Sequence, residues 1–99
     1  MSQKIDLPST AAVLPQTWRS TIVGRAAGAN VKVLRMDGAA YSTECHDFDE
    51  ALLVLDGQMH LEIFGRVVEV HAGEVFIVPS GIPHAVAPGS EGTLVIIDR

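Results

Sequence analysis

Short apolar segments alternate with glycine- and proline-containing turns along most of this chain, and this rhythm restricts the fold more than any other sequence feature. Residues 31–33 and 59–63 alternate apolar and polar side chains, the period expected of half-buried β-strands. Four further runs rich in β-branched residues have the length of buried strands: residues 52–55, 67–70, 75–78 and 94–97. Turn signals separate these runs, at Asp37-Gly38, Asp56-Gly57, Gly65, Gly73, Gly81 and Gly89. The sequence therefore predicts an all-β fold, an antiparallel sandwich or barrel.

The length of the chain limits it to one domain. Its 99 residues leave no room for a second core, so we expect residues 1–99 to form a single domain. The one cysteine, Cys45, cannot form an internal disulfide. A domain of this size therefore needs packing, self-association or a bound metal for its stability. No apolar run reaches the length of a signal peptide or a membrane span, and we expect a soluble, cytoplasmic protein.

Charge is unevenly distributed along the chain. Residues 1–36 hold five basic residues and one acidic residue, whereas residues 37–74 hold nine acidic residues and one basic residue. The formal net charge of -5 argues against nucleic acid or an anionic membrane as a partner. Five ionisable side chains fall within seven residues of the acidic stretch, at Glu44, His46, Asp47, Asp49 and Glu50. Such a cluster is either a solvated loop or a set of side chains gathered around a cation.

Three of these residues, together with a later histidine, have the pattern of a metal site. On a strand from Tyr41 to His46, Glu44 and His46 would project from the same face because they are two residues apart. Glu50 follows a short turn and can open the next strand with its carboxylate directed toward the same point. His84 follows a rigid proline-containing turn, which would fix its position as a fourth ligand.

The spacing of these residues resembles the two motifs of the cupin family. The first motif reads G-x5-H-x-H-x3-E-x6-G, and residues 38–57 match every spacing, with Glu44 in place of the first histidine. The second motif reads G-x5-P-x-G-x2-H-x3-N, and residues 73–88 match it, with Pro88 in place of the asparagine. The chain is similar to small single-domain bacterial cupins of the RmlC-like type. This resemblance implies a cupin-type double-stranded β-helix, a jelly-roll barrel of antiparallel strands.

The resemblance also implies a metal centre. Carried over position by position, the family's metal ligands become Glu44, His46, Glu50 and His84. Two imidazoles and two carboxylates suit a divalent transition metal such as Fe, Mn, Ni, Co or Zn. The implied function is a dioxygenase- or isomerase-type enzyme acting on a small oxygenated metabolite, with Glu44 or Glu50 as catalytic proton acceptor. The alternative is a non-catalytic cupin that binds a small molecule or a sugar, with or without metal.

Six residues are candidates for the wall of a small-molecule pocket near this centre: Tyr41, Phe48, Leu52, Met59, Phe76 and Val86. The aliphatic and buried aromatic members of this set would equally serve as barrel core. Trp18 could cover the barrel mouth or pack in a dimer interface, and we favour the interface. Arg35 is a candidate for binding a substrate carboxylate, although a lone arginine near the end of a strand is more often solvated.

The N-terminal segment is the least patterned part of the chain. Residues 1–16 contain two prolines and several small residues, and we expect an arm or an edge strand laid on a neighbouring chain. The small cupins that this sequence resembles commonly pair through sheet edges and swapped N-terminal strands, and exposed sheet edges need protection. The resemblance therefore implies a homodimer.

Overall fold

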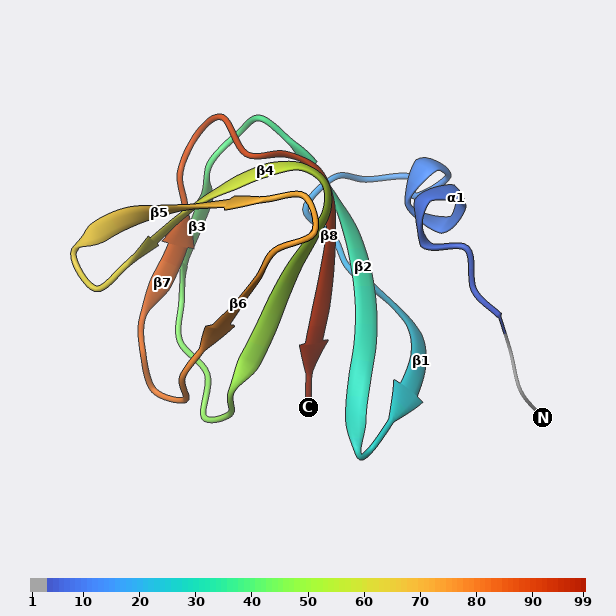
Figure 1. The fold of residues 1–99 in the computed structure, drawn as a ribbon, viewed down its shortest axis with the longest axis horizontal. Coiled ribbons are helices and arrows are strands. Elements are labelled where there is room, and N and C mark those ends of the chain that lie inside the picture. Colours follow the sequence, from blue (N-terminus) through green and yellow to red (C-terminus); the bar gives the residue numbers. More distant parts are fainter. Residues whose placement is uncertain (1–3) are drawn as a thin grey trace.

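The computed structural model describes residues 4–99, and within them nearly all regular structure is antiparallel β-sheet (Figure 1). One short helix and eight strands follow each other along the chain: α1 (Leu7–Ala12), β1 (Thr21–Ala26), β2 (Ala29–Asp37), β3 (Tyr41–Glu44), β4 (Glu50–Ile63), β5 (Arg66–His71), β6 (Val75–Val78), β7 (His84–Val86) and β8 (Glu91–Asp98). The strand order is β1-β2-β8-β4-β7-β3, and both β5 and β6 also pair with β4. The sheet curls around a shared interior (Figure 1). The predicted all-β jelly-roll fold is confirmed.

Strand β4 connects the two halves of the barrel. Its first half pairs with β6 and β8, and its second half pairs with β5 and β7. The register shifts between Val54 and Asp56, and Gly57 lies opposite Gly92 of β8. A Cβ atom on Gly57 would collide with the backbone carbonyl of Glu91, so the close approach of the two strands requires glycine. The predicted turn at Asp56-Gly57 is therefore wrong, because this glycine bends one continuous strand and does not end it.

The interior of the barrel is apolar over most of its length. Alternate side chains of β4 point inward, and Val54, Met59 and Leu61 are fully buried. They belong to one cluster of buried residues drawn from five strands: Leu34, Met36, Leu52, Val54, Met59, Leu61, Ile63, Val70, Val78 and Leu94. This cluster is the packed core of the barrel, and it supports the polar residues at one end of the interior.

The outer face of the same sheet carries a second buried cluster, which α1 covers. Ala11 of the helix packs against Val33 of β2 and Val95 of β8. The carboxylate of Asp6 caps the helix by accepting a hydrogen bond from the backbone N–H of Ser9, at 3.0 Å. The predicted arm or edge strand in residues 1–16 is therefore wrong for Leu7–Ala12, because a cap and an apolar sheet face favour a helix there. Residues 1–3 lie outside the described residues.

Arg35, a candidate for binding a substrate carboxylate, does not line the cavity that contains the polar cluster and contacts the end of α1. Its guanidinium Nη1 donates hydrogen bonds to the backbone carbonyl oxygens of Ala11, at 3.1 Å, and Leu14, at 2.9 Å. The Ala11 carbonyl oxygen also accepts from the backbone N–H of Leu14, and a cation beside the last carbonyl groups of a helix is favourable. Arg35 thus fixes the end of α1 against β2.

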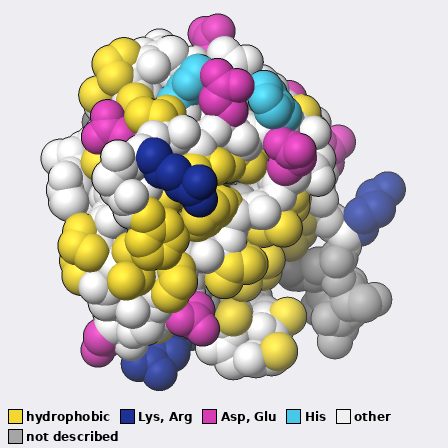
Figure 2. Space-filling model, turned by 60° about the vertical axis from the view of Figure 1, so that its left-hand side comes forward, with side chains coloured by type: hydrophobic (Ala, Val, Ile, Leu, Met, Phe, Trp, Pro, Cys, Tyr) yellow, Lys and Arg dark blue, Asp and Glu magenta, His cyan; other side chains and the backbone are white. Residues whose placement is uncertain are grey.

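Hydrophobic side chains are also exposed on the outside of the barrel. Figure 2 shows one side of the molecule, where hydrophobic side chains gather around a basic side chain, with histidine and acidic side chains above them. Large hydrophobic residues that are exposed on the strands or at their turns include Ile22, Phe64, Val67, Val75, Ile77 and Ile97. Among the described residues, no helix is long and apolar enough to cross a bilayer, since α1 has only six residues.

Candidate metal centre

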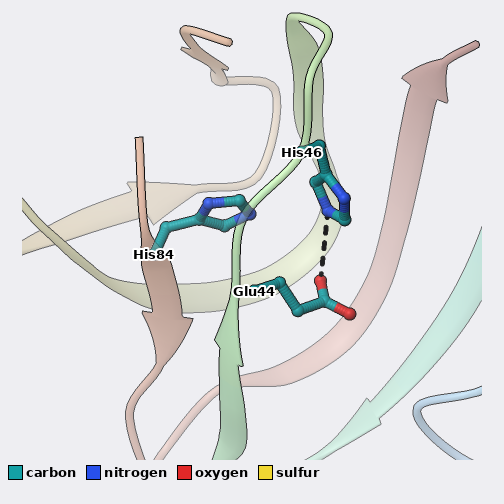
Figure 3. A group of neighbouring side chains, drawn as sticks. All are labelled: Glu44, His46 and His84. Carbon is teal, nitrogen blue, oxygen red and sulfur yellow. Dashed lines mark ion pairs between the residues drawn. The ribbon is translucent and has the colours of Figure 1, made fainter. Parts of the chain in front are cut away.

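Four polar side chains meet at one end of the barrel interior, and three of them are drawn in Figure 3. Glu44 ends β3, His46 lies in the loop that follows, Glu50 opens β4 and His84 opens β7. Strands β3 and β7 are paired so that Glu44 lies opposite His84. The strand expected to run from Tyr41 to His46 thus ends two residues early, yet the side chains of Glu44 and His46 still point toward one another (Figure 3).

The loop that carries His46 is tied to the turn before β7. The backbone N–H of Gly81 donates to the carbonyl oxygen of His46, at 2.7 Å. The backbone N–H of Ser80 donates to the carboxylate of Asp49, at 2.9 Å. These contacts hold the two histidine-bearing segments together, so the acidic loop has a structural role as well as a place in the cluster.

The ligand atoms of the cluster are close to one another. Nε2 of His46 lies 3.6 Å from Oε2 of Glu44 and 3.7 Å from Oε2 of Glu50. Nε2 of His84 lies 3.2 Å from Oε1 of Glu50, and one ligand atom each of Glu44, His46 and His84 lies within 4.8 Å of the others. Ligand atoms that each lie about 2.1 Å from one metal ion are about 3–4 Å apart. The cluster therefore has nearly the dimensions of a mononuclear metal site.

Burial dominates the electrostatics of Glu50. Its side chain is 6% exposed, and this loss of solvation raises the pKa of Glu50 above its ordinary value. The nearby histidines oppose the rise, whereas the negative charge of Glu44 adds to it. A cation beside Glu50 would favour the ionised form of this carboxylate.

The orientation of His84 also favours a cation beside Glu50. Its Nδ1 lies 3.0 Å from the carbonyl oxygen of Ile82, and a neutral imidazole that donates there presents a lone pair at Nε2. That lone pair faces the Glu50 carboxylate, so the two groups require a proton or a metal ion between them. A backbone carbonyl that accepts from the outer ring nitrogen also orients many metal-binding histidines.

His46 provides the clearest sign that the cluster suits a metal ligand set. Its Nε2 is buried and has no hydrogen-bond partner among residues 4–99, an arrangement that costs free energy in a folded protein. The ring is held by stacking on Phe48, with centroids 5.0 Å apart and an interplanar angle of 10°. A nitrogen lone pair fixed beside two carboxylates fits a divalent transition metal. The donor set therefore suits the metal that the family resemblance implies.

The cluster opens into a cavity of about 150 Å³ in the barrel. Four of the six predicted pocket residues line it: Tyr41, Leu52, Met59 and Val86. Of the other two, Phe48 stacks on His46 from the loop, and Phe76 packs against the buried core. The pocket wall thus combines side chains of the core with the aromatic ring of Tyr41.

Trp18 also lines this cavity. It stacks on Tyr41, with ring centroids 5.5 Å apart, and its Nε1 donates to Oδ1 of Asp37, at 2.6 Å. Hydrogen bonds from Thr17 and Trp18 in turn lower the pKa of Asp37. The structure thus gives Trp18 a place in the cavity wall, and the favoured position in a dimer interface stays a prediction.

Two further polar residues line the cavity and were not predicted from the sequence: Lys32 and Asp98. They form an ion pair, although 66 positions separate them along the chain. The alternation of Val31, Lys32 and Val33 was a usable signal, because it places Lys32 on the face opposite to the two valines. Since the valines pack toward α1 on the outside of the barrel, Lys32 points into it.

Comparison with known proteins agrees with this architecture. A cupin-2 domain containing protein from Shewanella frigidimarina superposes with a TM-score of 0.86 at 21% identity, over 96% of this chain and 94% of that chain. A protein from Neisseria meningitidis gives a TM-score of 0.84 at 24% identity, over 97% of this chain and 98% of that chain. KdgF from a Halomonas species gives a TM-score of 0.67 at 22% identity, over 79% of this chain and 74% of that chain. At these identities the likeness shows the fold alone.

The sequence itself also matches a family model. No curated protein is similar enough in sequence to count as a match. Residues 33–98, however, match the model described as "Cupin domain". This region begins in β2, ends in β8 and contains both motifs together with all four residues of the cluster. The chain therefore belongs to the cupin domain family.

Proposed function

We propose that this cupin binds one divalent transition metal ion through Glu44, His46, Glu50 and His84, and that it is a metal-dependent enzyme acting on a small oxygenated molecule. One observation carries the proposal. The buried Nε2 of His46 has no hydrogen-bond partner among the described residues and faces two carboxylates. A metal ion at this point would satisfy the nitrogen and offset the repulsion between the carboxylates.

The surroundings of the two glutamates suit different roles in such an enzyme. A bound divalent ion would supply a Lewis acid to a substrate oxygen. The side chain of Glu44 is 42% exposed, so when it is not ligated it can accept a proton from a substrate and release it to solvent. Glu50 is buried with a raised pKa, so it can retain a proton inside the cavity when it is not ligated. This pairing supports isomerase- or dioxygenase-type chemistry.

The donor set also limits the metal. Imidazole and carboxylate ligands favour Fe, Mn, Ni, Co or Zn, and no sulfur ligand belongs to the four-residue cluster. Glu44 takes the place of a histidine in the motif, and the extra negative charge would make a bound metal a weaker Lewis acid. We therefore expect a bound water to be less acidic here than in a centre with three histidines.

The proposal is tested by metal analysis of protein purified without chelator, followed by titration of the chelator-stripped protein with Zn²⁺ and Mn²⁺. We expect about one transition metal ion per chain and a rise in melting temperature on titration, because binding only to the folded state stabilises it. His84→Ala should lose both effects. His71→Ala, which removes an exposed histidine of β5, should retain them. A wild-type protein that carries no metal and gains no stability from either ion would refute the proposal.

We further propose that the protein is a homodimer that pairs through the outer sheet face beside α1. Ile77 of β6, Ala51 of β4 and Ile97 of β8 lie in one row across this face, and both isoleucines are exposed, as is Val75. A contiguous apolar sheet surface of this kind usually marks an interface. Light scattering after size exclusion should give twice the mass of the chain, and Ile77→Lys should shift it to a monomer. A monomeric wild type would contradict this assembly.

A further inference from the structure

A second polar group lies in the cavity, outside the candidate metal centre. Nζ of Lys32, on β2, lies 2.9 Å from Oδ2 of Asp98, at the end of β8. Their side chains are 23% and 6% exposed, and both line the cavity into which the cluster opens. Among the described residues of that wall, Lys32 is the one lysine or arginine. A buried ion pair contributes little net stability, so its place in the cavity suggests a role in binding.

The hydrogen-bonding capacity of this group is only partly used. Oδ1 of Asp98 is buried and has no partner within residues 4–99, and the same is true of Oδ1 of Asn30. Asn30 lies opposite Asp98 in the pairing of β2 with β8. The lysine ammonium has three N–H donors, one of which is directed to Asp98. Of these residues, Lys32 and Asp98 line the cavity, so its wall combines donors of Lys32 with the unpartnered oxygen of Asp98.

A hydroxyl group matches this combination better than an anion does. A hydroxyl accepts a hydrogen bond from an ammonium and donates its own proton to a carboxylate or amide oxygen. A ligand carboxylate at Lys32 would instead be placed beside the free oxygen of Asp98 and repelled by it. The cavity already contains the carboxylates of Glu44, Glu50 and Asp98, which Lys32 and one divalent ion would balance. A neutral ligand keeps this balance.

We propose that the Lys32–Asp98 pair is a hydroxyl-binding subsite and that the ligand is a small neutral polyol or sugar. The inference rests on the proposed function, because a second oxygen of the same ligand would meet the metal centre. The cavity volume of about 150 Å³ lies below the roughly 300–1,000 Å³ of pockets for drug-sized molecules. Apart from Ser20 and the four cluster residues, apolar side chains and the stacked pair Trp18–Tyr41 form the remaining wall, which suits the C–H faces of such a ligand.

The test measures amide chemical shifts of ¹⁵N-labelled protein, in metal-free and Zn²⁺-loaded form. The neutral probes are glycerol, xylitol, D-xylose and D-glucose. D-xylonate serves as the matched anion, and tetrahydropyran serves as a sugar-like ring without hydroxyl groups. We expect at least one neutral polyol to shift the amide signals of Lys32 and Asp98, and D-xylonate and tetrahydropyran to bind about tenfold or more weakly.

A double variant, Lys32→Met with Asp98→Leu, replaces the ion pair by apolar side chains of similar shape, a change that folded proteins often tolerate. It should weaken polyol binding by about tenfold or more while Zn²⁺ binding stays unchanged, since none of the four cluster residues is altered. Arg25→Met, on the exposed side of β1, is the control and should bind polyols as the wild type does.

The outcomes separate this inference from the proposed function. Zn²⁺ binding without binding of any neutral probe would overturn the subsite and leave the metal centre standing. Polyol binding to metal-free protein that depends on Lys32 and Asp98, in a protein that takes up no metal, would refute the metal centre and support the subsite. Tighter binding of D-xylonate than of D-xylose to the metal-free protein would overturn the subsite, because no metal is then present to bind the carboxylate.

Discussion

Two groups of histidine and carboxylate side chains lie on this barrel, and their contact distances are nearly the same. Inside, His46 lies 3.6 Å from Glu44. Outside, on β4 and β5, His60 lies 3.7 Å and His71 3.5 Å from the carboxylate oxygens of Glu69. The outer Glu69 and His71 side chains are 58% and 61% exposed, whereas the inner Glu50 and His84 are 6% and 5% exposed. His60 and His46, at 26% and 27%, do not differ in exposure. Distances alone therefore do not distinguish a site from a surface cluster.

The two groups differ in how far their polar atoms are buried and in how many of them face one point. In the outer group, water solvates the charges and weakens the contacts, so ion pairs there contribute little. In the inner group, Nε2 of His46 is shielded from water and lacks a partner among residues 4–99, and burial raises the pKa of Glu50. The inner side chains thus keep an unfavourable arrangement that a cation would relieve, and the outer group has no such need.

The largest expected contrast comes from removing both histidines of each group. His46→Ala with His84→Ala should weaken Zn²⁺ binding by more than about 100-fold, because both imidazole ligands are lost. Loss of a residue that only hydrogen-bonds to a metal ligand already lowers metal affinity by about 10- to 100-fold. His60→Ala with His71→Ala should bind Zn²⁺ as the wild type does. Isothermal titration calorimetry measures both affinities, and circular dichroism verifies that both variants fold. Equal losses in the two variants would contradict the distinction.

Removing one buried carboxylate should have the next largest effect. Glu50→Gln keeps the shape of the side chain but removes its charge, and we expect Zn²⁺ affinity to fall by about 10- to 100-fold. Glu69→Gln makes the same change in the outer group and should alter the affinity by less than about twofold, since exposed charges act weakly. The same calorimetric titration gives both values. An unchanged affinity in Glu50→Gln would exclude Glu50 as a ligand.

Glu44 should respond less than Glu50 because its side chain is partly solvated. Glu44→Gln should lower Zn²⁺ affinity by about tenfold or less, whereas Glu44→His should restore or exceed the wild-type value, because imidazole is itself a good zinc ligand. Glu69→His adds a histidine to the outer group and should leave binding unchanged. Equal affinities in Glu44→Gln and Glu44→His would show that the side chain does not reach the metal.

The smallest effect concerns the pH dependence of metal-free protein. The raised pKa of Glu50 means that its contribution to stability is complete below the unfolded-state pKa and is lost as pH rises through the folded-state pKa. Urea unfolding at a series of pH values should show this decline in wild type and Glu69→Gln. Glu50→Gln cannot titrate and should lack it. The lowered pKa of Asp37 acts in the opposite sense, with stability lost as pH falls, so the two carboxylates are separable.

Much of the fold and of the candidate site was predictable from local patterns. The period of two and the turn residues predicted most of the strands, because both depend on neighbouring residues. The motif spacings placed Glu44, His46, Glu50 and His84 in one set, and the structure brings their side chains together. Strand β1 was not predicted, and Asp56-Gly57 was misread, since a glycine that bends a strand has the same local signature as one that ends it.

The sequence by itself determined the fold class, the family motifs and the chain positions that could ligate a metal, because these are encoded by residue type and spacing. Only the tertiary structure decided which polar groups are shielded from water. It brought Lys32 to Asp98 across 66 positions, turned Arg35 toward α1 and left His46 without a partner among the described residues. The physical reason is that burial and pairing depend on the register between strands distant in sequence, which no local pattern specifies.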